Sequence, residues 1–375
     1  MTVSLRAVRV MPSQEYGGQL TALPTFDNTK LVAINTCPLW GIVRYTHHKV
    51  MNAPAGRSMA LEAGGAAHEV FAAHRLYTFR EFGPSFYEVT DTDSIERAFV
   101  YNGERIFGRQ RFAEMLGAVD SREDFRSRCQ QFSLTALFNS GFYDDPFDKK
   151  RTTTNIEEMC IAYMDKFDWS DQLPYWDGAL FLGIEQPVDV VVRLSYGDND
   201  GNSKQIDIRF IGKADGLHYT STGRDTLRIH ENKTASRLGD AWEMSWETNH
   251  QPTGYMIALT AILSLPISKA LMLGTALPLP KSYSVNGIAR VVVNREKWQF
   301  EEWFKWLLHT TMIHEEYKDD PTNAPQYTHS CNRYFRPCAY VPLCATSPDE
   351  RPDFFADMVE AEWNPLTPTQ EMTDE

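Results

Sequence analysis

Residues 188–233 decide the fold. They read VDVVVRLSY (188–196), GDNDGNS (197–203) and KQIDIRFIGKADGL (204–217), followed after the turn-like TSTGRD (220–225) by TLRIHENK (226–233). β-Branched residues alternate with other residues in the first and third stretches, while glycine, aspartate and asparagine fill the second. Because the side chains of a strand alternate between the two faces of a sheet, this pattern predicts a β-hairpin followed by a third strand.

The segments on either side of the hairpin predict a mixed sheet flanked by helices. Downstream, apolar patterns predict a helix over 249–265, strands over 270–277 and 288–293, and a helix over 296–317. Upstream, we expect a helix within 59–77, starting near Gly65, and a mainly helical stretch over 95–170, where Thr154 and Glu157 match a capping box. This order of elements indicates an α/β core with a helical insertion.

The domain organisation follows from these changes of pattern. We expect one domain over 1–345, interrupted by a mainly helical insertion at 77–180. Residues 346–375 are rich in proline, aspartate and glutamate and end in EMTDE, which predicts an acidic, loosely packed tail.

The composition is that of a globular protein. Of the 375 residues, 42% are hydrophobic and 23% charged, which is atypical of disordered or fibrous chains. The net charge of −13 excludes a generic basic nucleic-acid coat, but it allows a nuclease with a local basic groove. The N-terminus shows no signal peptide, and prolines and a lysine interrupt the apolar stretch 255–279, so no membrane span is expected. Six cysteines without a secretion signal indicate a reducing, cytoplasmic compartment.

Two carboxylates and one lysine are expected to meet on neighbouring strands. Asp215 ends the second strand of the hairpin, and Glu231 and Lys233 lie two residues apart on the next strand, so they project from one face. Carboxylates at a strand edge can hold Mg²⁺ or Mn²⁺, and the ammonium could orient a water or stabilise charge developing on a phosphate. Charges alternating along a solvated strand are the alternative.

Three more residues could complete this site. His68, in the helix predicted within 59–77, could add an imidazole to an oxygen-rich coordination shell; a histidine on the helix surface or in the core is the alternative. Gln251 and Tyr255 lie four residues apart and would share a face of the next predicted helix. Alternatively, they mark a helix start and one buried aromatic side chain.

Three cysteines form a second group. Cys331, Cys338 and Cys344 lie within the fourteen residues CNRYFRPCAYVPLC, and Cys37 precedes them by roughly 290 residues. Three clustered thiolates need a fourth ligand to close a tetrahedral or cuboidal site, and Cys37 is the candidate. A four-cysteine zinc site, a disulfide pair and unlinked buried thiols are the alternatives.

In combination, these motifs resemble the PD-(D/E)XK nucleases of the RecB type. The resemblance is greatest to the branch with a four-cysteine iron–sulfur cluster, which includes AddB nuclease domains and CRISPR-associated exonucleases of bacteria and phages. Six motifs occur in the order of that family: Cys37-Pro38, Gly65-x-x-His68, Gly212-x-x-Asp215, Glu231-x-Lys233, Gln251-x-x-x-Tyr255 and the C-terminal cysteine trio. None of them is specific alone, but the complete ordered set is.

The resemblance implies a restriction-endonuclease-like core and assigns a role to each site residue. The residues that it places in the active site are His68, Asp215, Glu231, Lys233, Gln251 and Tyr255. The first three would bind Mg²⁺ or Mn²⁺, Lys233 would be the catalytic lysine, and the last two would shape the site and the DNA path. Glu185 stands where related viral exonucleases carry an extra acidic residue, so it is an auxiliary metal-ligand candidate, with a surface glutamate as the alternative.

The resemblance also implies that the four cysteines hold a 4Fe-4S cluster joining the N- and C-terminal parts, with zinc as the less favoured occupant. The chain departs from the family at three points. Asn232 replaces an aromatic residue between Glu231 and Lys233, and we expect it to point away from the site and matter little. The gap between Cys331 and Cys338 is wider than usual, which leaves the cluster type less fixed than its existence, and 77–180 matches nothing in the family.

The function expected from the resemblance is a metal-dependent DNA nuclease, and more narrowly an exonuclease on single-stranded DNA or DNA ends in recombination, repair or phage DNA metabolism. A structure-selective endonuclease and a non-cleaving DNA-end-binding subunit with a structural metal cluster are the alternatives. The sequence has no G-x-x-x-x-G-K-[ST] pattern, so a helicase or recombination protein would have to open the DNA as a partner.

Overall fold

A computed structural model describes residues 4–51, 59–86, 100–101, 104–105, 122–166, 180–197, 202–219, 227–280, 287–333 and 336–366. The chain divides into two compact units, each assembled from separate segments. The first comprises Met1–Arg57, Asp189–Gly212 and Lys297–Thr367, and the second comprises Ser58–Val188, Lys213–Glu296 and Pro368–Glu375. The domain boundaries predicted from the sequence, at 345 and around the insertion, stay predictions.

Strands β6 (Leu180–Gly197) and β7 (Ser203–Tyr219) form the predicted hairpin, and each contributes residues to both units. Both are longer than the sequence pattern predicts. Two bidentate pairs join them within the first unit: Arg193 with Asp207, and Arg209 with Asp189. Such paired arginine–carboxylate bonds are geometrically specific, so they help to fix the register of the hairpin.

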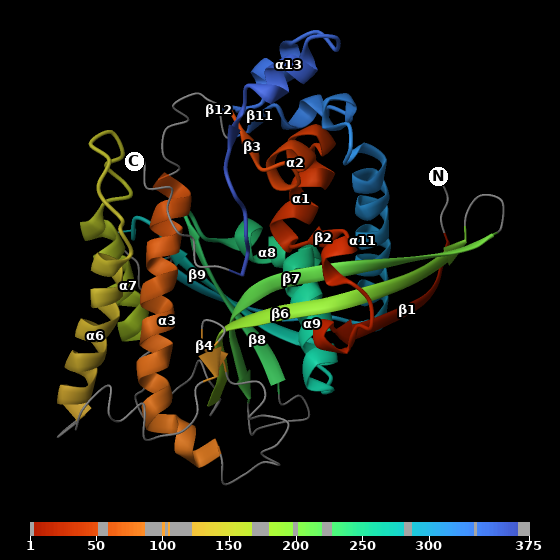
Figure 1. Cartoon of the computed structure of the whole chain (residues 1–375). Coiled ribbons are helices and arrows are strands. Elements are labelled where there is room, and N and C mark those ends of the chain that lie inside the picture. The colour runs from red at the N-terminus through yellow and green to blue at the C-terminus, as the bar shows by residue number, and fades with distance from the viewer. Residues whose placement is uncertain are drawn as a thin grey trace. The chain divides into compact units, whose positions relative to one another are not determined.

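The first unit pairs β1 antiparallel with β6, and β2 parallel with β7. Its strands and α-helices are β1 (Ser4–Pro12), β2 (Thr25–Phe26), β3 (Lys49–Val50), β11 (Asn332–Arg333), β12 (Arg336–Pro337), β13 (Val359–Glu360), α1 (Asn28–Thr36), α2 (Pro38–Tyr45), α11 (Lys297–Tyr317), α12 (Val341–Ala345) and α13 (Arg351–Ala356). Short 3₁₀ helices cover Ser13–Glu15, Leu20–Ala22, Pro321–Asn323 and Thr328–Ser330. Helices α1 and α2 pack on α11, the helix predicted over 296–317 (Figure 1). The ring of Trp303 on α11 meets Phe210 on β7 edge to face, which buries both side chains.

The second unit contains a mixed sheet in the order β6-β7-β8-β9-β10. Its elements besides the hairpin are β4 (Val100–Tyr101), β5 (Glu104–Arg105), β8 (Leu227–Ala235), β9 (Lys269–Ala276), β10 (Ile288–Asn294), α3 (Met59–Phe86), α6 (Arg122–Asn139), α7 (Thr153–Lys166), α8 (Asp240–Thr248) and α9 (His250–Leu263). β8 is antiparallel to β7 but parallel to β9, and β10 is antiparallel to β9. Helices α3, α6 and α7 lie side by side in Figure 1 and pack through an apolar cluster against β9. The predicted α/β fold, a mixed sheet flanked by helices, is therefore confirmed, and it is consistent with a restriction-endonuclease-like core.

Two local expectations need correction. The predicted capping box started at Thr154, but α7 begins at Thr153, because the hydroxyl of Thr152 accepts a hydrogen bond from the main-chain N–H of Asn155. The acidic segment after 345 is packed over its described part: β13 pairs with β3, and the indole of Trp363 donates to Asp27 at 2.6 Å. Much of the expected insertion at 77–180 lies outside the described residues; the described part holds α6, α7 and the β4–β5 pair.

None of the described helices combines the length and the apolar character that crossing a bilayer requires.

Candidate active site

The two carboxylates predicted from the sequence meet where β7 and β8 pair. Gly216 pairs with His230 in the antiparallel register, which places Asp215 and Glu231 next to each other at the end of the paired stretch. The main-chain N–H of Asp215 donates to Oε1 of Glu231 at 3.2 Å. Asp215 is 7% exposed and Glu231 only 1%, so both residues are buried between neighbouring interior strands of the sheet. Burial of two adjacent carboxyl groups requires compensating charge or hydrogen bonds.

Lys233 and Gln251 provide that compensation at Glu231. The Lys233 ammonium lies 2.9 Å from Oε2 of Glu231, as the spacing of two residues on one strand predicts. The amide of Gln251 donates to the same oxygen at 3.3 Å from the first turn of α9, whose start is capped by Asn249. Tyr255 lies one helical turn after Gln251 and is buried. The structure therefore brings Lys233 and Gln251 to the carboxylate of Glu231.

His68 and Glu185 approach the same site through other elements. Nδ1 of His68, on α3, lies 3.4 Å from Oδ1 of Asp215. Glu185, on β6, pairs with Lys213 at 2.9 Å, and burial, together with the nearby charge of Asp215, raises the pKa of its carboxyl group. Glu185 also has a φ of 52°, a conformation that costs energy in a non-glycine residue and is concentrated at functional sites. The structure thus gives the auxiliary candidate Glu185 a place beside the carboxylates.

The environment gives the carboxyl groups of Asp215 and Glu231 different pKa values. Burial, together with the charge of Asp215, raises the pKa of Glu231 to about 7, against the opposing effect of Lys233. Burial also opposes ionisation of Asp215, but His68 and Lys233 outweigh it and hold the pKa of Asp215 well below its usual range. Burial lowers the pKa of Lys233, but Glu231 and Asp215 raise it by more, so the ammonium stays charged. Pairs of carboxyl groups separated in this way are typical of sites that exchange protons or bind cations.

The donor types suit a divalent cation, but the side chains do not form a closed cage. Among the described residues, no group of three or more His, Cys, Asp or Glu side chains is arranged to hold a metal ion. Protein groups engage the carboxylate oxygens instead: Lys233 and Gln251 at Glu231, and His68 at Asp215. Carboxylates and one imidazole are ligands that Mg²⁺ and Mn²⁺ accept, so the residues fit the ion in kind. Binding would exchange these internal contacts for contacts to the cation.

Two residues at this site were missed by sequence reasoning. The main-chain N–H of Asn232 donates to Oδ2 of Asp215 at 2.6 Å. Its buried side chain turns to Tyr163, as expected, and the contact with Asp215 comes from the main chain, which an aromatic residue at this position would also supply. The guanidinium of Arg75 donates to the main-chain carbonyl of Asp215 at 2.8 Å. A main-chain donor leaves no mark in a sequence, whereas the spacing of seven residues between His68 and Arg75 could have placed both on one face of α3.

The four cysteines form the second candidate site, within the first unit. Cys37 is buried at the junction of α1 and α2, Cys331 follows the 3₁₀ helix Thr328–Ser330, and Cys344 lies in α12. The main-chain N–H of Cys338 donates to the carbonyl of Cys331 at 2.7 Å. Burial, together with the nearby Cys37, Cys331 and Cys338, raises the pKa of the Cys344 thiol to about 11. The fold therefore places Cys37 near the C-terminal trio, but these four described thiols, like the carboxylates above, are not arranged as a closed metal-holding group.

The chemistry of this donor set fits either a cluster or zinc. All six cysteines lie within the described residues, and none of them forms a disulfide. Cys129 and Cys160 are buried in α6 and α7 of the second unit, and burial raises the pKa of Cys160 strongly, as for an inert core thiol. Four thiols can ligate a 4Fe-4S cluster or one Zn²⁺, so the occupant stays a prediction.

Comparisons with known proteins add little to this geometry. No protein-family model and no curated protein sequence matches the chain. Among solved structures, an alkaline exonuclease (LHK-Exo) from Laribacter hongkongensis aligns with a TM-score of 0.24 and 13% sequence identity, over 55% of this chain and 86% of that one. At this score and identity, the likeness assigns no function to this chain.

Proposed function

We propose that this protein is a divalent-metal-dependent DNA nuclease, and more narrowly an exonuclease acting on single-stranded DNA or DNA ends. The observation that carries the proposal is the pairing of two buried acidic residues: the main-chain N–H of Asp215 donates to the carboxylate of Glu231, and the ammonium of Lys233 lies 2.9 Å from that carboxylate. This is the arrangement that the Asp…Glu-x-Lys spacing predicts for phosphodiester hydrolysis.

The residues support distinct tasks in such a reaction. Asp215 and Glu231 would hold Mg²⁺ or Mn²⁺, with His68 and Glu185 at the edge of the shell, and the ion would supply a Lewis acid for a phosphate oxygen. The Lys233 ammonium would orient the attacking water and stabilise the negative charge that grows on the phosphate. Gln251 keeps the Glu231 carboxylate turned toward the site through its contact at 3.3 Å. Tyr255, one turn further along α9 and buried, would shape the site and the DNA path through its packing.

We propose that Cys37, Cys331, Cys338 and Cys344 hold a 4Fe-4S cluster, with zinc as the less favoured occupant. Phosphodiester hydrolysis needs no electron transfer, so the role of the cluster would be structural. Cys37 and the trio are roughly 290 residues apart, and joining such distant residues removes much of the entropy of the unfolded chain. Removal of the cluster should therefore loosen the first unit before it affects the chemistry.

The biological setting also belongs to the proposal. The substrate would be DNA with a free end, in recombination, repair or phage DNA metabolism within the cytoplasm of a bacterial or phage-infected cell. Because the sequence carries no P-loop pattern, strand opening would come from a helicase or recombination protein.

Digestion of end-labelled linear and closed circular single-stranded DNA, with and without Mn²⁺, tests this function. We expect Mn²⁺-dependent loss of linear DNA while circles stay intact. Cleavage of circles would indicate the endonuclease alternative. Binding to DNA ends without any cleavage would contradict the enzyme and favour a non-cleaving end-binding subunit. An Asp215→Asn variant, which keeps the size of the side chain, controls for contaminating nucleases.

A further inference from the structure

We infer that Arg75 is a positioning residue: it holds the main chain of Asp215, so that helix α3 contacts both the main chain and the carboxylate of this residue. The inference rests on the proposed function, because it assigns Asp215 a task as a ligand to a divalent cation. Arg75 itself would touch neither the cation nor the DNA. It would act through the orientation of Asp215.

Two side chains of α3 contact Asp215. Nη1 of Arg75 donates to the carbonyl oxygen of Asp215 at 2.8 Å, while Nδ1 of His68 lies 3.4 Å from the carboxylate. The two side chains start seven residues apart, on the same face of the helix and about 10 Å apart along its axis. The long side chain of Arg75 covers that distance, so the main chain and the carboxylate of Asp215 are held from one rigid element.

Burial shows that this contact is not incidental. Arg75 is 1% exposed, and a buried guanidinium must have its charge compensated. Asp215 supplies that compensation: after burial, His68 and Lys233, Arg75 contributes to the low pKa of the carboxyl group. The charge that stabilises Asp215 as a carboxylate therefore comes partly from the buried guanidinium of Arg75.

Tyr163, on α7, supports Asp215 indirectly through Asn232. Asn232 donates from its main chain to Oδ2 of Asp215 at 2.6 Å, and its side-chain carbonyl accepts a hydrogen bond from the hydroxyl of Tyr163 at 3.2 Å. Burial raises the pKa of Tyr163 to about 12 against the opposing effect of Arg75, which places the guanidinium near that phenol. Arg75, Tyr163 and Asn232 thus form one buried polar network behind the metal-ligand candidate.

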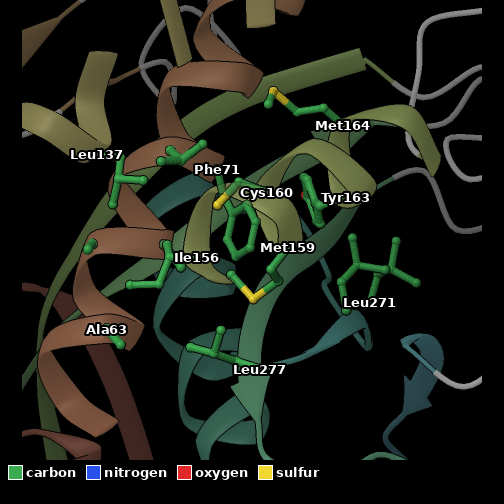
Figure 2. Packing of buried hydrophobic residues seen from close by; sticks show 14 residues of the cluster. Ala63, Phe71, Leu137, Ile156, Met159, Cys160, Tyr163, Met164, Leu271 and Leu277 are labelled. Carbon is green, nitrogen blue, oxygen red and sulfur yellow. The ribbon is translucent and has the colours of Figure 1, made fainter. Parts of the chain in front are cut away.

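The apolar packing makes this network rigid. Phe71, one helical turn before Arg75, packs its ring on Tyr163 with centroids 4.1 Å apart. Figure 2 shows Phe71 and Tyr163 within the cluster of α3, α6, α7 and β9, together with Ile156, Met159 and Leu271. Well-packed side chains have few alternative rotamers, and partners behind a metal ligand change affinity through its orientation.

The test is equilibrium Mn²⁺ binding to the full-length protein, measured as free Mn²⁺ by electron paramagnetic resonance, with thermal unfolding followed in parallel. The variants are Arg75→Met, Arg75→Lys and Tyr163→Phe. Arg209→Met is the matched control. Arg209 is half-buried and donates to Asp189 at 2.9 and 2.6 Å within the first unit, which holds none of the residues of this site.

We expect Arg75→Met to raise the Kd for Mn²⁺ about 10- to 100-fold, the range for partners behind metal ligands. Arg75→Lys should raise it less, and Tyr163→Phe by several-fold. The control should lose thermal stability but keep the Kd within about twofold of wild type.

An unchanged Kd in Arg75→Met and Tyr163→Phe would overturn the inference and leave Arg75 as a core residue. If Arg75→Met does not fold, Arg75→Lys and Tyr163→Phe still decide the question. Wild-type protein that neither binds Mn²⁺ nor cleaves DNA would instead refute the proposed function, and the inference with it.

Discussion

Replacing Lys233 with Met removes the ammonium but keeps much of the apolar volume of the side chain. The ammonium acts on charge that exists only in the transition state, so the loss should appear in kcat. A single donor that stabilises such charge is typically worth a factor of about 10²–10³ in rate, or about 3–4 kcal/mol. We therefore expect kcat to fall by that factor while the KM for DNA stays nearly constant.

The structure also determines how much folding stability Lys233→Met loses. Lys233 is the charged partner of Glu231, which is 1% exposed, and breaking a buried pair usually costs about 3–5 kcal/mol. Here the cost is limited, because the pKa of Glu231 is already about 7 and rises further once the ammonium is removed. At pH 7 the carboxyl group takes up a proton instead of staying charged. Since one pKa unit corresponds to 1.36 kcal/mol, we expect a loss of about 1–2 kcal/mol.

The assay is steady-state cleavage of linear single-stranded DNA, at a Mn²⁺ concentration that saturates each variant. Saturation matters because a protonated Glu231 binds the cation less well. Lys30→Met is the matched control: Lys30 is also a buried lysine, 8% exposed, but it belongs to the first unit. Its turnover should match wild type. Near-normal turnover in Lys233→Met, with Mn²⁺ saturating, would refute the assignment of the lysine.

Three further predictions concern other buried groups. His68→Ala should shift the Mn²⁺ dependence of cleavage to higher concentration, with activity partly restored by excess Mn²⁺; an unchanged titration would return His68 to a structural role. Protein purified without oxygen should be brown and contain roughly four irons per chain, and Cys37→Ala should abolish both and lower the stability of the fold. The control Cys129→Ala should keep the iron. Protein that contains one zinc and no iron would refute the cluster but not the nuclease. Burial, with the charge of Lys30, lowers the pKa of His314 to about 4, so this histidine contributes about 3 kcal/mol above pH 6.5 that is lost as the pH falls toward 4. In denaturant unfolding, His314→Gln should therefore show a shallower loss of stability over that range, and an equal slope would contradict the assignment.

Regular strands and helices were predictable because their side-chain periods are visible in the sequence. The alternation in VDVVVRLSY and KQIDIRFIGKADGL gave the hairpin, and the apolar run after Asn249 gave α9. The start of β6 was not predictable, because Gly183 and Pro187 normally break a strand. The structure continues through them, with Glu185 at positive φ. Helix α8 has only nine residues, too short for a clear period.

In the candidate site, too, only the residues that a regular spacing brings together were predictable. Spacing alone brought together Asp215, Glu231 and Lys233, because residues two apart share a face and neighbouring strands meet at one edge. Arg75 and the main-chain N–H of Asn232 were not predictable in this way. The first depends on how α3 packs against the sheet, and the second on a backbone group that every residue except proline carries.

The central claim is that Asp215 and Glu231 together hold a divalent cation. Anomalous diffraction from wild-type crystals soaked in Mn²⁺ tests it most directly. We predict a peak about 2.1 Å from a carboxylate oxygen of each residue, the distance typical of small divalent ions, with the Lys233 ammonium displaced from its contact with Glu231. Crystals of DNA-cleaving protein that show no peak at these two carboxylates, or one only at other residues, would contradict the claim.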